Sequence, residues 1–367
     1  MKDRIKNIVV TMVFVIVIFG FMLMNIATPD AQLSASERRR LAQRPKASIE
    51  NILSGALFED LEDYLLDQFV FRDMFRGIKA FSTYYVFHQK DNNGIYIQDE
   101  SIIKMEYRLN EKSVLNAAAK LNEIYDRFLT GKNVSYAVIP DKNYFTADHY
   151  GALSLDYQKM MSLMRDHVSN MNYIDLFGVL SSDDYYRTDI HWRQEKITDV
   201  ADVLLKGMGN KASTSDQNYT QHTLYPFYGS YYGQAALSLA PDSLVYLTDT
   251  GIENAVVYDY ETQSKSGVYV PEKFSGIDPY DVYLSGAKAL ITIENPNSLS
   301  QKELILFRDS FGSSMAPLLL KGYSKITLVD LRYFATDLLD DYIDFSQDQD
   351  VLFLYNTLVL NNSYMLK

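Results

Sequence analysis

The sequence contains no cysteine, and this absence excludes several kinds of site at once. Disulfide bonds, a cysteine nucleophile, cysteine-bound zinc and iron–sulfur clusters all require thiols that this chain lacks. Histidine is also scarce, with five residues in a chain of 367. These histidines are scattered without the paired spacing of metal ligands, so we expect no metal site, and no sequence motif predicts a cofactor.

Positive charge is in short supply as well. The 35 lysines and arginines are outnumbered by 47 aspartates and glutamates, which gives a formal net charge of -12. A nucleic-acid-binding protein needs a basic face to neutralise phosphates, so this balance argues against a nucleic-acid partner. With 47% hydrophobic residues, the chain has enough apolar material for one large globular domain or two modest ones.

Charge is absent altogether from residues 8–27, which read IVVTMVFVIVIFGFMLMNIA. Twenty residues of helix reach about 30 Å, the thickness of a bilayer core, so we expect a transmembrane anchor. A cleavable signal peptide is the competing interpretation, but the run is longer than a usual signal-peptide core and no clear A-x-A site follows it. Basic residues within residues 1–7 directly abut the run, which favours a cytoplasmic tail there and a single-pass protein whose body is extracytoplasmic.

Beyond the anchor, the sequence predicts three further regions. Residues 28–48 are polar and contain two prolines, so they are predicted to be a juxtamembrane linker with a solvated arginine cluster. Residues 49–130 are predicted to be a helical entry region, because apolar residues recur at helical spacing. Residues 131–367 alternate strand and helix, which predicts an α/β domain with a parallel sheet. A stretch at about 211–299, rich in glycine, serine and tyrosine, is predicted to be a β-rich insertion in that domain.

Three strands predicted near the C-terminus each end at a polar cluster. The predicted strands are residues 303–307, 325–330 and 351–355. The polar residues that follow them are, in order, Ser310, then Arg332 with Tyr333, and Asn356. In an open parallel sheet, ligands bind outside the carboxyl ends of the strands, so we expect these residues to lie in one cleft.

One histidine has a neighbour suited to general-base chemistry. His191 lies in TDIHW, two residues after Asp189 and directly before Trp192, the one tryptophan of the chain. In an extended or turn-like loop, residues i and i+2 point the same way, so the Asp189 carboxylate can hold one imidazole nitrogen while the other faces a serine. A serine hydroxyl needs such a base because it is a poor nucleophile at neutral pH. We interpret Asp189 and His191 as an activating pair.

Ser310 is the matching nucleophile, because RDSFGSS places it between an apolar strand and the start of a predicted helix. There the backbone N–H groups and the helix dipole can stabilise an oxyanion. The alternative is that Asp309 or Ser310 simply caps the helix. Further candidates for oxyanion or substrate contacts are Asn356, Arg332, Tyr333 and Trp192.

The segments TDIHW, RDSFGSSMAPLLL, ITLVDLRY and LFLYNT, in this order, resemble the DHHW family of bacterial surface proteins. That family is related to the SGNH hydrolase-like domains of the alginate O-acetylation proteins AlgJ and AlgX. The segments ERRRLAQRPK, NILSGALFEDLEDYLLDQFVFRD and IPDKNYF share the resemblance, which therefore runs from about Glu37 to the C-terminus. It implies an SGNH hydrolase-like α/β fold, with Asp189 and His191 as acid and base and Ser310 as nucleophile. Ile190 stands where the family's name implies a first histidine.

The resemblance also implies a function, namely transfer of an acyl group, expected to be acetyl, to a hydroxyl of an extracytoplasmic polysaccharide. A membrane-bound O-acyltransferase is the implied partner, since a single anchor cannot itself pass an acyl donor across a bilayer. Two alternatives stay open. A carbohydrate acetyl esterase would use the same residues with water as acceptor, and a non-catalytic polysaccharide-binding or surface-assembly protein would keep the fold alone.

Overall fold

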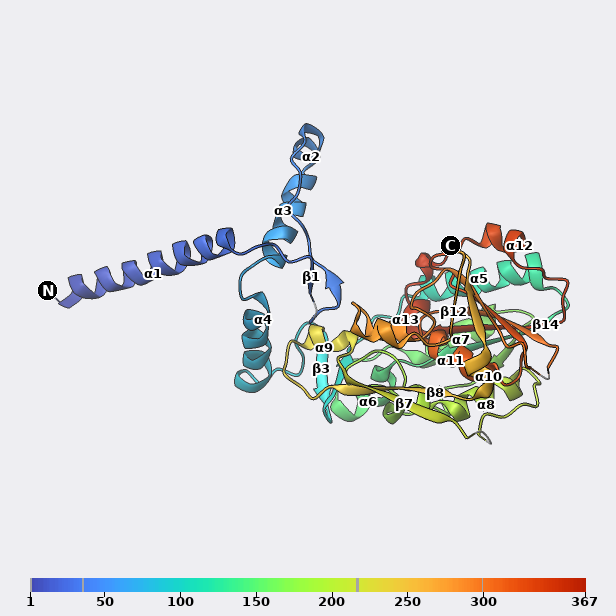
Figure 1. Ribbon diagram of the computed structural model, residues 1–367. Helices are drawn as coiled ribbons and strands as arrows, with labels where there is room; N and C mark the ends of the chain where they lie inside the picture. Colours follow the sequence, from blue (N-terminus) through green and yellow to red (C-terminus); the bar gives the residue numbers. More distant parts are fainter. Residues whose placement is uncertain (1, 35, 216–217, 299) are drawn as a thin grey trace. The chain divides into compact units, whose positions relative to one another are not determined.

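The computed structural model describes residues 2–34, 36–215, 218–298 and 300–367 (Figure 1). The chain divides into two compact units. Unit 1 combines residues 1–92 with the distant segment 232–238, and unit 2 contains residues 93–231 and 239–367. The predicted boundaries of the linker and of the helical entry region stay predictions.

The centre of unit 2 is an eight-stranded sheet with the strand order β10-β9-β11-β13-β12-β14-β5-β6. Five of its strands pair in parallel: β5 (Asn133–Ile139), β6 (Asn172–Ile174), β12 (Glu303–Arg308), β13 (Lys325–Val329) and β14 (Gln349–Asn356). Three more are joined by antiparallel pairings: β9 (Val256–Asp259), β10 (Ser264–Ser266) and β11 (Leu290–Glu294). All three come from the predicted insertion, which is β-rich and completes one edge of the parallel-rich sheet through antiparallel pairings.

The central strands are apolar on both faces, as expected for strands covered by helices on each side. Side chains alternate along β12, so Leu304 and Leu306 join one core cluster while Ile305 and Phe307 join another. The first cluster includes side chains of α8 (Thr198–Gly207) and α11 (Phe311–Leu319), and the second includes those of α5 (Glu111–Ile124) and α7 (Tyr157–His167). The result is a three-layer α/β arrangement in which β12 leads directly into α11.

Shorter elements complete unit 2. Its hairpins pair β3 (Ile95–Gln98) with β4 (Ser101–Lys104) and β7 (Thr220–Phe227) with β8 (Asp242–Thr248). Its other α-helices are α6 (Lys142–Tyr150), α10 (Thr250–Asn254), α12 (Leu339–Tyr342) and α13 (Thr357–Leu360). A π-helical turn, η2 (Tyr125–Leu129), extends α5, and 3-10 helices are η3 (Ser182–Asp184), η4 (Gln194–Lys196), η5 (Pro271–Ser275), η6 (Pro279–Val282), η7 (Thr336–Leu338) and η8 (Ser363–Met365). Helix α9 (Ser230–Ala235) contains residues of both units.

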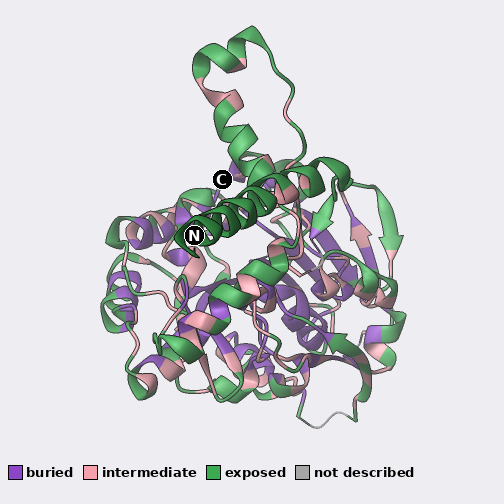
Figure 2. Ribbon diagram, turned by 90° about the vertical axis from the view of Figure 1, so that its left-hand side faces the viewer, coloured by how far each residue is buried: buried purple, intermediate pink, exposed green. Residues whose placement is uncertain are grey.

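Unit 1 is mostly helical, and few of its residues are buried (Figure 2). Its helices are α1 (Lys2–Ala27), α2 (Ile49–Ser54), α3 (Ala56–Asp67) and α4 (Arg72–Phe81), which continues into the π-helical turn η1 (Ser82–Val86). Two short strands, β1 (Leu33–Ser34) and β2 (Arg39–Arg40), pair with each other. Among the described residues, α1 is the one helix long and apolar enough to cross a membrane.

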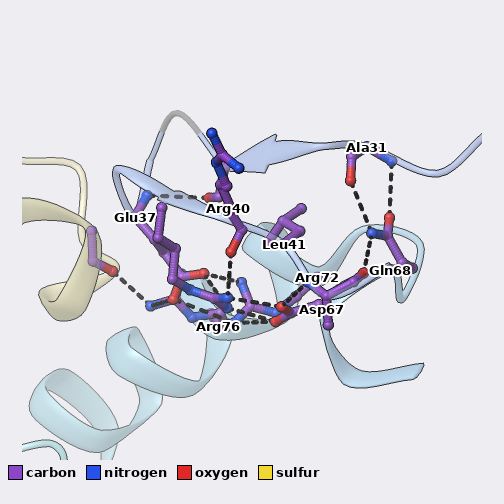
Figure 3. A network of polar contacts seen from close by, with 12 residues as sticks. Ala31, Glu37, Arg40, Leu41, Asp67, Gln68, Arg72 and Arg76 are labelled. Atoms are coloured by element: carbon purple, nitrogen blue, oxygen red, sulfur yellow. Dashed lines mark hydrogen bonds and ion pairs between the residues drawn. The ribbon is translucent and has the colours of Figure 1, made fainter. Parts of the chain in front are cut away.

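A network of charged side chains ties the segment after α1 to α3 and α4 (Figure 3). Arg39 donates two hydrogen bonds to Asp67, at 2.5 and 2.8 Å, and Arg72 donates to Glu37 at 2.6 Å. Arg76 forms a further ion pair with Glu37 at 3.1 Å. The Arg39 side chain is 41% exposed, as a solvated cluster would be, but its guanidinium also pairs with Asp67 of α3 and with the neighbouring Glu37.

Candidate active site

The structure brings Asp189, His191 and Ser310 together in one hydrogen-bonded chain. Asp189 Oδ1 lies 2.5 Å from His191 Nδ1, and His191 Nε2 lies 2.7 Å from Ser310 Oγ. With Nδ1–H donated to the carboxylate, Nε2 is the nitrogen that accepts the proton of the serine hydroxyl. This is the arrangement in which a neutral imidazole can act as a general base toward a serine.

The Asp189 carboxylate is fully buried and accepts hydrogen bonds from backbone N–H groups as well as from the imidazole. The His191 backbone N–H donates to Oδ1 at 2.9 Å, and the Ser230 backbone N–H donates to Oδ2 at 2.6 Å. These bonds satisfy a charge that would otherwise be costly to bury, and they fix the direction in which the carboxylate faces the ring.

The loop that carries His191 is folded back on itself and fastened at one end. Backbone bonds join Tyr186 N–H to His191 C=O and Arg193 N–H to Asp184 C=O. Thr188 donates both its backbone N–H and its hydroxyl to Asp242 Oδ2, at 2.8 and 2.6 Å. The spacing of two residues thus places the Asp189 carboxylate against His191 Nδ1 within a bent loop.

A glycine allows another segment to approach this loop closely. A Cβ added at Gly229 would lie 2.3 Å from Thr188 O and 2.4 Å from Asp189 Cβ, closer than real Cβ atoms come to backbone. Gly229 N–H also donates to Thr188 Oγ1 at 3.0 Å. The segment that delivers the Ser230 N–H to Asp189 thus depends on the absence of a side chain at position 229.

The His191 ring is held by aromatic side chains that the sequence did not identify. The Tyr280 ring, on η6, stacks on the imidazole with a centroid distance of 3.8 Å and an angle of 7°, and the Phe311 ring lies 5.0 Å away. Tyr280 is itself fastened by its hydroxyl, which donates to Ser314 Oγ at 2.8 Å. Tyr280 lies in the predicted insertion, where tyrosines are common, so neither its position nor its type distinguished it.

A buried lysine also supports this loop. Lys142 Nζ donates to the backbone carbonyls of Ile102, Tyr186 and Arg187, at 2.5, 3.0 and 3.2 Å. Burial lowers the pKa of Lys142 to about 7, while the charges of Asp189 and Asp242 act in the opposite direction. The segment IPDKNYF contains this lysine and carried part of the family resemblance, but its role becomes visible only from the carbonyls that it binds.

At the start of α11, the side chain that bonds the backbone is that of Asp309 and not that of Ser310. Its Oδ1 accepts the Phe311 N–H at 2.9 Å, and its Oδ2 accepts the Asn356 N–H at 2.7 Å. Burial raises the pKa of the Asp309 carboxyl. Among the described residues, Ser310 makes no side-chain capping bond at the start of α11, so its hydroxyl faces His191 instead.

The remaining candidates are spread over different roles. Asn356 donates its side-chain N–H to Ile139 O and accepts the Leu358 N–H, so these contacts do not support the predicted role as oxyanion donor. Arg332 is bonded to Asp330 at 2.9 and 2.6 Å, whereas the neighbouring Tyr333 is 53% exposed and can reach a ligand. For both, contact with substrate stays a prediction.

The expectation that Trp192 contacts substrate is corrected, because a fully buried side chain cannot contact a polysaccharide. Its indole N–H donates to Ser314 Oγ at 2.8 Å. This bond attaches the His191 loop to α11. Ile190, which replaces the first histidine implied by the family name, packs against the apolar core cluster that includes Trp192. An apolar residue is therefore suited to position 190 in this chain.

A parallel-rich sheet, a serine at the junction of β12 and α11, and a D-x-H loop beside it define an SGNH hydrolase-like α/β protein. A family model described as DHHW protein matches residues 129–329, more than half of the chain. The chain belongs to the DHHW family. A comparison with curated proteins finds no significant match.

Two solved structures support the same fold. A DHHW family protein from Eubacterium siraeum is 22% identical, with a TM-score of 0.61 over 75% of this chain and 94% of that one. PatB1 from Bacillus cereus is 16% identical, with a TM-score of 0.56 over 73% of this chain and 97% of that one. The O-acetyltransferase domain of Pseudomonas putida AlgJ is more distant, with 13% identity and a TM-score of 0.45 over 73% of this chain and 92% of that one.

Proposed function

We propose that this chain is a serine O-acyltransferase that carries an acyl group, expected to be acetyl, on Ser310 and passes it to a hydroxyl of a cell-surface or exported polysaccharide. The observation that carries the proposal is the continuous hydrogen-bonded chain from Asp189 through His191 to Ser310. Membership of the DHHW family supports the choice of acyl transfer to a polysaccharide, because that family resembles the alginate O-acetylation proteins AlgJ and AlgX.

In the first half-reaction, His191 Nε2 takes the hydroxyl proton while Ser310 Oγ attacks the acyl carbonyl carbon. The carbonyl oxygen becomes an oxyanion, which we expect the Ser310 backbone N–H and the dipole of α11 to stabilise. The imidazolium then gives its proton to the leaving group as the bond to that group breaks. Asp189 stabilises the imidazolium through the bond at Nδ1.

In the second half-reaction, the acceptor hydroxyl occupies the place of the departed group. His191 Nε2 removes its proton, the acceptor oxygen attacks the acyl-serine carbonyl, and the proton returns to Ser310 Oγ as the ester to serine breaks. The acyl group has then moved from one oxygen to another, and the enzyme is regenerated.

We further propose that α1 is a membrane anchor and that the body of the protein is extracytoplasmic. The acyl donor would then be supplied by a membrane-bound O-acyltransferase, which is the partner that this topology requires. These assignments rest on the length and apolar character of α1 and on the family resemblance.

The test combines active-site labelling with turnover, using the full-length protein in detergent. A structure of Bacillus cereus PatB1 carries a sulfonyl adduct, so a sulfonyl fluoride is a suitable probe, read by intact-protein mass. Turnover is measured with a chromogenic acetyl ester. We expect wild type to gain one adduct and to hydrolyse the ester, and Ser310→Ala and His191→Ala to lose roughly a thousandfold or more in kcat. Ser313→Ala, one helical turn along α11, is the matched control and should retain activity.

The acceptor distinguishes transferase from esterase. Oligosaccharides are added to the acetyl ester, and acetylated sugar and free acetate are measured separately. Acetylated sugar that disappears with Ser310→Ala supports the proposal, whereas acetate alone would identify an esterase. A folded wild type that neither labels nor turns over would overturn the catalytic proposal and favour a polysaccharide-binding protein.

A further inference from the structure

Helix α4 has one face that packs within unit 1. Arg76 Nη2 donates to Gly233 O at 2.6 Å, and a Cβ added at Gly77 would lie 3.5 Å from Ala236 O. Ala80 on the same side is fully buried. The small residues of α4 therefore face the segment 232–238, which belongs to this unit.

The opposite face of α4 and η1 is apolar and exposed. Its members recur at intervals of three or four residues and form one stripe: Met74, Phe75, Ile78, Phe81 and Tyr85. Each of these side chains is between 40% and 56% exposed. A continuous exposed stripe of large apolar residues marks a surface that binds something apolar, because scattered single residues do not align in this way.

The apolar stripe is continuous with the apolar surface of α1. The Phe21 ring lies 5.7 Å from the Phe69 ring and 5.7 Å from the Phe75 ring. Val70 N–H also donates to Asn25 Oδ1 at 2.9 Å. The start of α4 is thus attached to the last turns of the helix that we propose to span the membrane.

The position of this contact along α1 indicates the depth of α4 in a bilayer. Phe21 precedes the end of α1 at Ala27 by six residues, which corresponds to about 9 Å of helix. If residues 8–27 fill the hydrocarbon core, Phe75 then lies about that far inside its outer limit. Amphipathic helices that lie in the membrane interface bury their apolar face by about 5–10 Å, so the two depths agree.

We propose that α4 and η1 form an interfacial helix whose apolar stripe lies in the outer leaflet of the bilayer. Its two arginines suit this position, because Arg72 and Arg76 are both paired with Glu37 within unit 1. Tyr85 lies near the C-terminal end of the stripe, where an aromatic ring with a polar tip suits the headgroup region. The inference goes beyond acyl transfer and rests on the proposed anchor.

The absence of native cysteine allows a direct test by single-cysteine labelling. Ile78→Cys places an environment-sensitive fluorophore on the stripe, and Asp73→Cys places it on the other side of the same helix, where the Asp73 side chain is 63% exposed. Val15→Cys reports the middle of α1. Each full-length variant is reconstituted into phosphatidylethanolamine–phosphatidylglycerol vesicles, with and without phosphatidylcholine that carries a quenching doxyl group on its acyl chain.

We expect the Ile78 probe to lose most of its fluorescence to the doxyl lipid, as the Val15 probe does, while the Asp73 probe stays unquenched. Quenching at Val15 without quenching at Ile78 would overturn the interfacial helix and leave the anchor in place. A blue-shifted Ile78 probe that lipid does not quench would assign the stripe to a second copy of the chain and would also overturn the proposal. If Val15 is not quenched, the anchor fails and the interfacial helix fails with it.

Discussion

At the scale of single residues, the site depends on how the His191 ring is oriented. Tyr280 covers one face of the imidazole in nearly parallel contact, and its hydroxyl is bonded to Ser314. A parallel stack restricts rotation of the ring about its own bonds, and this keeps Nε2 directed at Ser310. Tyr280 is therefore a positioning residue.

We predict that Tyr280→Ala lowers kcat for the acetyl ester by roughly tenfold, because an aromatic pair contributes up to about 1.5 kcal/mol beyond its burial. Tyr280→Phe keeps the ring and should retain most activity. The pH dependence of kcat/KM separates positioning from general loss of structure: it should shift with Tyr280→Ala and not with Tyr280→Phe. Equal rates for all three proteins would remove Tyr280 from this role.

Lys142 gives a prediction about pH and stability. Burial lowers its pKa from 10.5 to about 7, so between these values the unfolded chain binds a proton that the folded chain does not. The free energy of unfolding should therefore increase as the pH rises across that window. The increase is at most about 1.4 kcal/mol for each unit by which the pKa differs between the folded and unfolded chains. Denaturant unfolding of wild type against Lys142→Met tests this, since the variant should lack that pH-dependent gain.

Sequence reasoning selected the three residues of the candidate site and missed those that hold them in position. Asp189, His191 and Ser310 were identified because their types and local spacing have a chemical meaning, and the structure places them in contact. Lys142 and Tyr280 act through contacts with residues distant in the chain. Tyrosine and lysine are common residues, so only the folded backbone shows which copy reaches the site.

At the scale of elements, the turn before α9 determines how closely two segments meet. Gly229 allows the backbone there to lie against Thr188 and Asp189, and Ser230 N–H then bonds the carboxylate. A side chain at position 229 would strike backbone, which cannot move aside as a flexible side chain can.

We predict that Gly229→Ala lowers kcat and changes KM little, because the added methyl group displaces the backbone around Asp189 rather than a substrate pocket. The loss of activity should be at least tenfold, since one hydrogen bond to a buried carboxylate contributes about 1.5–3 kcal/mol. Gly267→Ala is a suitable control, because its added Cβ would meet its nearest neighbour at 3.5 Å, an ordinary contact distance. Unchanged kinetics for Gly229→Ala would show that the loop adapts.

Prediction of the elements themselves succeeded where patterns were long and strongly apolar. The expected strands at 303–307, 325–330 and 351–355 correspond to β12, β13 and β14, and α11 follows β12 as expected. The insertion was harder, because an edge strand and a strand of a separate small sheet have the same local composition. Its strands β9, β10 and β11 join the main sheet through pairings that depend on distant partners.

At the scale of the whole molecule, α1 decides where the protein resides. As an uncleaved anchor it should keep the chain in the membrane fraction after alkaline carbonate washing, with detergent needed for extraction. A cleaved signal peptide would instead yield a shorter soluble protein, so the mass of the mature chain distinguishes the two. Protease added outside intact cells should degrade the body of the protein if it is extracytoplasmic.

Unit 1 is built from two pieces of chain that are far apart in sequence, and this matters for anyone who wishes to express a soluble version. A Cβ added at Gly233 would meet Ser36 O, and Arg76 binds Gly233 O, so the segment 232–238 relies on residues upstream of Asn93. A fragment beginning at Asn93 would leave that segment without its packing partners. We expect such a fragment to aggregate, because the surface of the segment that these partners cover would be exposed. A fragment beginning at Ala31 removes α1 and keeps both partners, so the useful cut lies just after α1 rather than at the first residue of unit 2.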